Sequence, residues 1–118
     1  MGLDISHDCW NGPYSSFNRF RKSLAQQIGI DLNEYIGYGN EGIKDLTSIN
    51  HDLMPLFNHS DCDGRLSINE SKQIAKGLDS ILLNLNNEIV DCDFKESIIK
   101  FRNGCLDAIS KNETIIFC

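Results

Sequence analysis

Residues 2–28 read GLDISHDCWNGPYSSFNRFRKSLAQQI and join a short alternating segment to a longer helical one. In the first segment Leu3 and Ile5 alternate with polar residues, which predicts a short half-buried strand. Apolar side chains then recur at helical spacing, which predicts a helix over residues 13–28. Residues 11–13 are Asn-Gly-Pro, a combination typical of turns, so we expect a turn between the strand and the helix.

The rest of the chain shows the patterns of further helices and of a closing strand. Pro55 favours a short helix that begins near it, because proline is poorly tolerated inside a long helix. Ser67 and Glu70 have the spacing of a capping box, which predicts the start of another helix. A last helix is expected over residues 91–111, and the β-branched and apolar residues 114–117 predict a strand.

The order of these elements predicts an α+β fold, in which about four helices pack with a small sheet formed by the N- and C-terminal strands. A polar loop is expected over residues 58–66. The 118 residues, 41% of them hydrophobic, are enough for one buried core but not for two independent ones. We therefore expect a single domain over residues 1–118.

Charge and cysteine content limit the classes of function. The net charge of −6 argues against binding of long nucleic acid, because phosphate tracts require clustered cations. No run of about 18 apolar residues is present, so no membrane partner is expected. Asp4 and Asp8 interrupt the apolar run that a signal peptide requires. The odd number of cysteines and the absence of a CxxC pair favour reduced thiols and a cytoplasmic location.

Residues 59–70 resemble the calcium loop of an EF-hand. Asp61, Asp63 and Glu70 take its third, fifth and twelfth positions, and a glycine takes the sixth. The first position is His59 where calcium loops have aspartate, and imidazole nitrogen is a poor ligand for a hard cation. We therefore favour a loop without metal and expect no cofactor. The alternative is a divalent-metal-binding interaction module with these three carboxylates as its ligands.

Two weaker motifs have simpler interpretations. His7 and Cys9, together with His59 and Cys62, offer the nitrogen and sulfur ligands of a zinc site, but their spacing is not that of a zinc knuckle. We favour buried cysteines and hydrogen-bonded histidines. Residues 37–42, GYGNEG, match a dinucleotide-binding GxGxxG, but the run before them is a poor strand, so a loop is favoured.

The turn and first helix form the one clearly basic stretch of this acidic chain. Trp10 and Tyr14 could stack on nucleotide bases, while Arg19 and Arg21 could hold phosphate. Ser15 lies near the helix N-terminus, where anions are favoured. The alternative is that the aromatic residues belong to the core and the cations face water. No sequence motif of nucleophilic or metal-dependent catalysis is present, so we do not expect an enzyme.

Two long blocks of the sequence resemble a family of small phage-encoded proteins. The first is the opening GLDISHDCW at residues 2–10, which continues through Gly12, Tyr14, Ser15, Phe17, Arg19 and Arg21. The second is HSDCDG at residues 59–64, followed by a helix, and the resemblance extends over residues 94–117. It therefore covers most of the chain, but not residues 32–49.

We associate this family with phage sponges that disable CBASS defence by sequestering its cyclic-nucleotide signal. The resemblance implies a homo-oligomer in the host bacterial cytoplasm that binds a cyclic dinucleotide, such as cyclic GMP-AMP, without cleaving it. Because residues 32–49 lie outside the resemblance, it leaves the choice of nucleotide open. The ligand-binding residues that it implies are His7, Asp8, Trp10, Tyr14, Ser15, Arg19, Arg21, His59 and Asp61.

Overall fold

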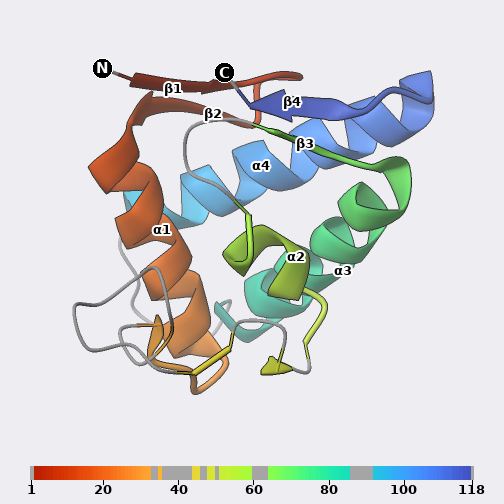
Figure 1. The fold of residues 1–118 in the computed structure, drawn as a ribbon. Coiled ribbons are helices and arrows are strands. Elements are labelled where there is room, and N and C mark those ends of the chain that lie inside the picture. Colours follow the sequence, from red (N-terminus) through yellow and green to blue (C-terminus); the bar gives the residue numbers. More distant parts are fainter. Residues whose placement is uncertain are drawn as a thin grey trace.

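The computed structural model describes residues 2–32, 35, 44–45, 48–49, 51–59, 64–85 and 92–117. Two strands begin this part of the chain, and two pairs of helices follow, each pair ahead of a single strand (Figure 1). In chain order they are β1 (Gly2–Ile5), β2 (Trp10–Pro13), α1 (Tyr14–Gln27), α2 (Met54–Phe57), β3 (Gly64–Leu66), α3 (Ile68–Leu85), α4 (Cys92–Lys111) and β4 (Ile115–Phe117).

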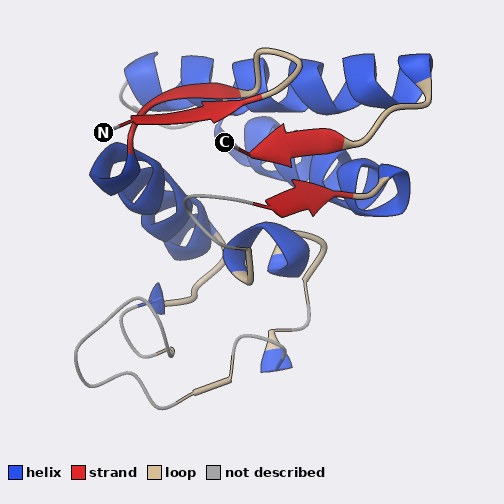
Figure 2. Cartoon of the chain, turned by 45° about the horizontal axis from the view of Figure 1, so that its top comes forward, coloured by secondary structure: helices blue, strands red, loops and turns tan. Residues whose placement is uncertain are grey.

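One antiparallel sheet has the strand order β2-β1-β4-β3. The N- and C-terminal strands meet in its centre, where Ile5 is paired with Phe117. Figure 1 shows the sheet nearly edge-on with α4 running along one face, and Figure 2 shows the sheet lying across α4 and α3. The predicted α+β fold, with helices packed against a sheet that contains both terminal strands, is therefore confirmed.

The predicted turn at residues 11–13 is wrong, because these residues belong to β2. The chain reverses earlier, at residues 6–9, which we call the hairpin turn. There the backbone N–H of Cys9 donates to the carbonyl of Ser6 at 3.3 Å. Pro13 is tolerated because β2 is an edge strand, where a missing backbone N–H breaks little of the hydrogen-bond ladder.

The predicted polar loop at residues 58–66 is also wrong at its end. Gly64, Arg65 and Leu66 form β3 and pair with the C-terminal strand. This strand is too short to show an alternating pattern in the sequence, and its pairing partner lies about 50 residues further on. The long-range pairing, rather than local preference, therefore determines its conformation.

Alternation along the strands places the core between the sheet and the helices. Leu3, Ile5, Ile115 and Phe117 are buried, whereas the intervening Asp4 and Ile116 are exposed. The helices bury the facing stripes of apolar residues that their spacing predicts. The largest fully buried side chains of these helices and of the segments between them are Phe17, Leu24, Leu32, Leu53, Leu56, Phe57, Ile74, Leu78, Ile81 and Phe101.

The helix starts follow the local signals of the sequence. Glu70 N–H donates to Ser67 Oγ at 3.1 Å, and Ser67 N–H donates to Glu70 Oε1 at 2.9 Å, so the predicted capping box is confirmed. Pro55 lies in the first turn of the short helix α2, as expected. Among the residues that the structure describes, no helix combines the length and the apolar character needed to cross a membrane.

A buried glycine lets α4 approach the hairpin turn closely. A Cβ atom on Gly104 would lie 2.3 Å from Cys9 Sγ and 2.9 Å from the carbonyl oxygen of His7. Atoms do not approach this closely without contact strain, so only glycine fits at this crossing. The position of Gly104 therefore fixes the hairpin turn against the middle of α4.

Candidate functional site

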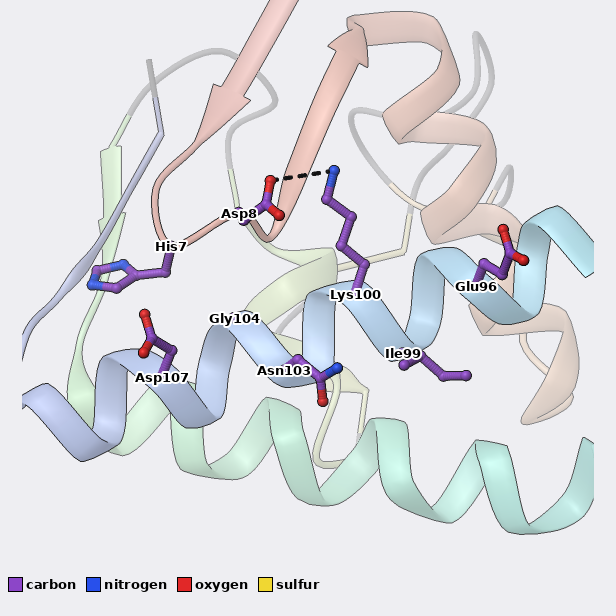
Figure 3. A pocket seen from close by; sticks show the side chains of 8 residues that line it. All are labelled: His7, Asp8, Glu96, Ile99, Lys100, Asn103, Gly104 and Asp107. Atoms are coloured by element: carbon purple, nitrogen blue, oxygen red, sulfur yellow. Dashed lines mark ion pairs between the residues drawn. The ribbon is translucent and has the colours of Figure 1, made fainter.

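A pocket of about 420 Å³ lies between the hairpin turn and α4 (Figure 3). The turn forms one wall, and successive turns of α4 form the other. Its volume lies within the range of pockets that hold small molecules. The lining residues are His7, Asp8, Glu96, Ile99, Lys100, Asn103, Gly104 and Asp107.

The His7 side chain is held by contacts on both sides of its ring. Its Nε2 lies 3.0 Å from Glu113 Oε1, and its Nδ1 lies 2.8 Å from Ser6 Oγ. Ser6 Oγ also accepts a hydrogen bond from the backbone N–H of Ile116 at 2.8 Å. Only 11% of the imidazole side chain is exposed. These contacts tie the wall of the pocket to β4 and to the connection that precedes it.

His7 and Asp8 have an unusual backbone conformation. Their φ angles are +60° and +59°, in the left-handed region that side chains other than glycine seldom adopt. Two consecutive positive φ angles are typical of the tight hairpin turn in which asparagine and glycine are preferred. The histidine and aspartate are therefore held in a strained conformation, and such strain is concentrated at functional sites.

Asp8 joins the hairpin turn to α4 through an ion pair. Its carboxylate lies 3.5 Å from Lys100 Nζ, the ion pair drawn as a dashed line in Figure 3. Both side chains are accessible to water, so the pair adds little stability by itself. The Lys100 ammonium can therefore exchange this partner for an anionic group of a ligand.

The charges in the pocket are mixed. Three carboxylates, those of Asp8, Glu96 and Asp107, line the pocket together with the ammonium of Lys100 and the amide of Asn103. Carboxylates accept hydrogen bonds from N–H groups, and the ammonium donates to phosphate or carboxylate. The pocket therefore offers several acceptors for N–H donors and one cation for an anionic group.

Two free thiols, that of Cys9 in the hairpin turn and that of Cys105 in α4, are fully buried. A hydrogen bond with Cys9, together with burial, raises the pKa of the Cys105 thiol well above its ordinary value of 9.0. The Cys105 thiol therefore stays protonated at neutral pH, where a thiol is a weak nucleophile. It acts as a small core residue, which agrees with our interpretation of the cysteines.

The structure separates the site residues that the sequence predicted. His7 and Asp8 lie in the pocket, whereas Ser15 and Arg19 are exposed on the first turns of α1. Trp10, at the start of β2, is partly buried and packs against the core. Its ring stacks on that of Phe20, with centroids 4.9 Å apart and planes inclined by 25°. Phe20 therefore covers one face of the indole.

Two more predicted residues, Tyr14 and Arg21, contribute to the interior. Tyr14 is half-buried and packs against the core. Arg21 is only 3% exposed, and its Nη1 donates to the carbonyl oxygens of His59 at 2.6 Å and Leu56 at 3.3 Å. Its guanidinium also lies over the ring of Phe17, 4.6 Å from the centroid. Arg21 thus joins α1 to the end of α2.

His59 packs against the sheet. Its ring lies 3.9 Å, between centroids, from that of Phe117, and its Nε2 is 3.1 Å from the carbonyl oxygen of Arg65. A Cβ atom on Gly64, whose φ is +99°, would lie 3.1 Å from the His59 ring, so glycine suits both the conformation and the space. The first residue of the calcium-like loop therefore contacts protein atoms.

The predicted metal and loop motifs lie largely outside the described residues. This applies to Asp61, Cys62, Asp63 and residues 37–42. Glu70 is described, and its carboxylate accepts the capping hydrogen bond of α3. In the part of the chain that the structure describes, no three His, Cys, Asp or Glu side chains are grouped closely enough to hold a metal ion.

Sequence reasoning missed the contribution of α4 to the pocket. Lys100, Asn103 and Asp107 lie on the polar side of an amphipathic helix, which is ordinarily a solvated face. The available signal was Gly104, because a glycine inside a helix is unfavourable and often marks a close approach of another segment.

Comparison of the chain with family models, with curated proteins and with solved structures gave no significant match to any of them. The function is therefore inferred from the residues of this chain and from the sequence resemblance described above.

Proposed function

We propose that this chain is a non-catalytic binding protein that sequesters a cyclic dinucleotide, such as cyclic GMP-AMP, in the pocket between the hairpin turn and α4. It would act in the cytoplasm of a phage-infected bacterium and remove the signal of CBASS defence. The resemblance of the opening residues 2–10 supports this class of ligand. Sequestration requires affinity rather than a reacting group, so the proposal assigns no catalytic residue.

The preorganised hairpin turn is the observation that carries the proposal. His7 and Asp8 keep positive φ angles while contacts to Ser6, Glu113 and Lys100 hold their side chains against the pocket. A turn fixed before the ligand arrives loses little conformational entropy on binding. The two residues belong to the sequence block that carries the resemblance.

The lining groups can bind the bases and one of the two phosphates of a cyclic dinucleotide. The carboxylates of Asp8, Glu96 and Asp107 can accept hydrogen bonds from the amino and ring N–H groups of the bases. Lys100 can donate to a phosphate once it leaves Asp8. Ile99 offers an apolar surface beside them. Because three acids and one lysine line the pocket, recognition would depend more on the bases than on the phosphates.

Thermal melting of the purified protein against cyclic and linear nucleotides tests the proposal. A ligand that binds only the folded state adds about 2.7 kcal/mol of stability at a hundredfold excess over Kd. We expect a shift of the melting temperature with one cyclic dinucleotide and none with its linear form. Absence of a shift with every cyclic nucleotide would overturn the proposal. Recovery of intact ligand from the denatured complex would exclude a hydrolase.

Matched variants distinguish this pocket from the basic surface of α1. Lys100→Ala and Asp8→Asn should each abolish or strongly reduce the nucleotide-dependent shift. Arg65→Ala removes an exposed cation from the other face of the sheet and should leave the shift unchanged. If Arg19→Ala abolishes the shift while Lys100→Ala preserves it, the ligand binds at the start of α1 and the pocket assignment is wrong.

The alternative function, a divalent-metal-binding interaction module, has one structural feature in its favour. Gly64, at the sixth position of the calcium-like loop, has the positive φ that a sharp turn requires. Calorimetric titration with Ca²⁺, and melting with and without EDTA, test this function. Glu70→Gln keeps an acceptor for the Ser67 N–H but removes a carboxylate ligand. Any Ca²⁺-dependent shift should therefore disappear in this variant if the loop holds the ion.

A further inference from the structure

The outward face of α4 carries an exposed seam at coiled-coil spacing. Ile99, Asn103 and Leu106 succeed one another at intervals of four and three residues, and Glu96 and Ser110 continue the same spacing. All five residues are exposed, and they lie opposite the side of α4 that is buried in the core. A helix that served only to cover the sheet would not need apolar residues on this side.

The apolar surface extends from this seam to α3. Leu83 is 71% exposed, and it shares with Ile99 a second pocket, of about 540 Å³. Ile99 also lines the first pocket, so the seam runs between two hollows of the surface. Single exposed apolar residues are ordinary, but Ile99, Leu106 and Leu83 belong to one face of the helix pair.

Opposite charges follow the seam on one side. Lys100 and Asp107 both lie on the side of α4 toward the hairpin turn, where both line the first pocket (Figure 3). Relative to Asn103, Lys100 comes three residues earlier and Asp107 four residues later. The cation and the acid are thus placed almost symmetrically about the middle of the seam.

We infer that α4 pairs with α4 of a second copy of this chain, antiparallel and about a two-fold axis at Asn103. In this arrangement Ile99 packs against Leu106 of the partner subunit, and Lys100 faces Asp107 of the partner subunit. The same operation places Asn103 against Asn103 of the partner subunit, where two amides can hydrogen-bond. One axis therefore satisfies the apolar, charged and amide positions together.

A parallel pairing does not fit the same residues. It would place Lys100 level with Lys100 of the partner subunit, and Asp107 level with Asp107 of the partner subunit. The two copies of Lys100 would then lie on opposite sides of the seam, as would those of Asp107, so the pairing of Lys100 with Asp107 across the interface would be lost. At one end of the seam, the antiparallel arrangement also brings Glu96 near Lys111 of the partner subunit. The charge pattern therefore selects the orientation.

The ion pairs that Lys100 and Asp107 form within one chain do not oppose the pairing of two copies. Lys100 Nζ lies 3.5 Å from Asp8, and Lys111 Nζ lies 3.2 Å from Asp107 one helical turn away. Both ion pairs are accessible to water, where such pairs contribute little. They can be exchanged for contacts across the interface, while burial of Ile99, Leu106 and Leu83 favours association.

The pairing would also close the pocket, a consequence that rests on the proposed function. Because Lys100 of the partner subunit would lie beside Asp107, and Asp107 of the partner subunit beside Lys100, each pocket would gain a cover and one further charge of each sign. The association itself is measured without nucleotide, so its failure and that of the proposed function are separate results.

A charge-swap series tests the interface by sedimentation and by light scattering over a concentration series. We expect the parent chain to be dimeric, Lys100→Glu and Asp107→Lys each to dissociate it, and the double variant to restore the dimer. Arg65→Glu changes an exposed charge on the opposite face of the sheet and should leave the dimer intact. A monomeric parent chain would overturn the inference, and so would failure of the double variant to differ from the singles.

Cysteine cross-linking tests the axis independently. Asn103→Cys places two thiols at the two-fold axis and should give a disulfide-linked dimer under mild oxidation. In Ser110→Cys the two thiols lie 14 residues apart along the paired helices, about 21 Å at 1.5 Å per residue, so no cross-link is expected. The parent chain controls for the native cysteines. Cross-linking of both variants, or of neither, contradicts the antiparallel arrangement.

Discussion

His7 Nε2 lies 3.0 Å from Glu113 Oε1, although 106 residues separate the two along the chain. The contact joins the hairpin turn near the beginning of the chain to the connection between α4 and β4. It lies next to the pairing of β1 with β4. Contacts between the two ends of the chain therefore both form the sheet and orient a wall of the pocket. The proposed site therefore depends on the complete tertiary fold.

A stabilising replacement of the hairpin turn should weaken nucleotide binding. Asn and Gly are the preferred residues at two consecutive positive φ angles, so His7→Asn with Asp8→Gly relieves strain. We expect the free energy of unfolding to rise by about 1 kcal/mol, while loss of the His7 and Asp8 side chains weakens binding at least about tenfold. Urea denaturation and calorimetric titration measure the two effects.

The single variant His7→Asn serves as a control for that replacement. His7→Asn alone keeps the Asp8 carboxylate, so it should retain part of the affinity. If the double variant is more stable and binds nucleotide as tightly as the parent chain, the strain has no role in recognition. The pocket would then not be the nucleotide site.

Local signals predicted most of the fold, and long-range pairing determined the rest. The alternation of Leu3 and Ile5 and the capping box at Ser67 describe interactions within a few residues, and both were confirmed. The turn was misplaced because Asn-Gly-Pro usually reverses a chain, whereas here residues 11–13 are held in an edge strand by β1. In β3, pairing with β4 prevailed over a polar local sequence.

Replacement of Arg21 should reduce stability without a direct effect on ligand binding. The side chain donates to the carbonyl oxygens of Leu56 and His59 in the interior. Arg21→Met would remove this donor from both acceptors. We expect a loss of about 3 kcal/mol in the free energy of unfolding. At a temperature where the variant remains folded, calorimetry should give the affinity of the parent chain. Reduced affinity of fully folded Arg21→Met would instead assign the guanidinium to the ligand.

The site was only partly predictable because sequence patterns do not show which surfaces meet. His7 and Asp8 were identified from the opening block, and the structure places both in the pocket. Lys100 and Asp107 come from a helix more than 90 residues away, where charged residues on the outer side have an ordinary explanation. Arg21 was assigned to the ligand, whereas the structure buries its side chain against the end of α2, a contact that no local pattern indicates.

Gly104→Ala should separate α4 from the hairpin turn. The added methyl group would meet Cys9 Sγ at 2.3 Å and the His7 carbonyl oxygen at 2.9 Å, so the turn must move. We expect a loss of about 1–3 kcal/mol in the free energy of unfolding, measured by urea denaturation. Cys9→Ala in the same chain removes the closer contact and should recover only part of this loss. Ser110→Ala, on the exposed side of α4, controls for alanine substitution in the helix and should change stability little.

The thiol of Cys105 should make the fold sensitive to alkaline pH. Its hydrogen bond with Cys9, together with burial, raises its pKa in the folded protein, whereas the unfolded chain has the ordinary value of 9.0. Above about pH 9 the unfolded state therefore holds fewer protons at this group than the folded state, and the free energy of unfolding falls as the pH rises. Urea denaturation from neutral pH to about pH 10.5 measures this slope. Cys105→Ala lacks the group, so its stability should be lower at neutral pH but decline less steeply. Equal slopes for the two chains would show that the thiol ionises as readily in the folded protein as in the unfolded one.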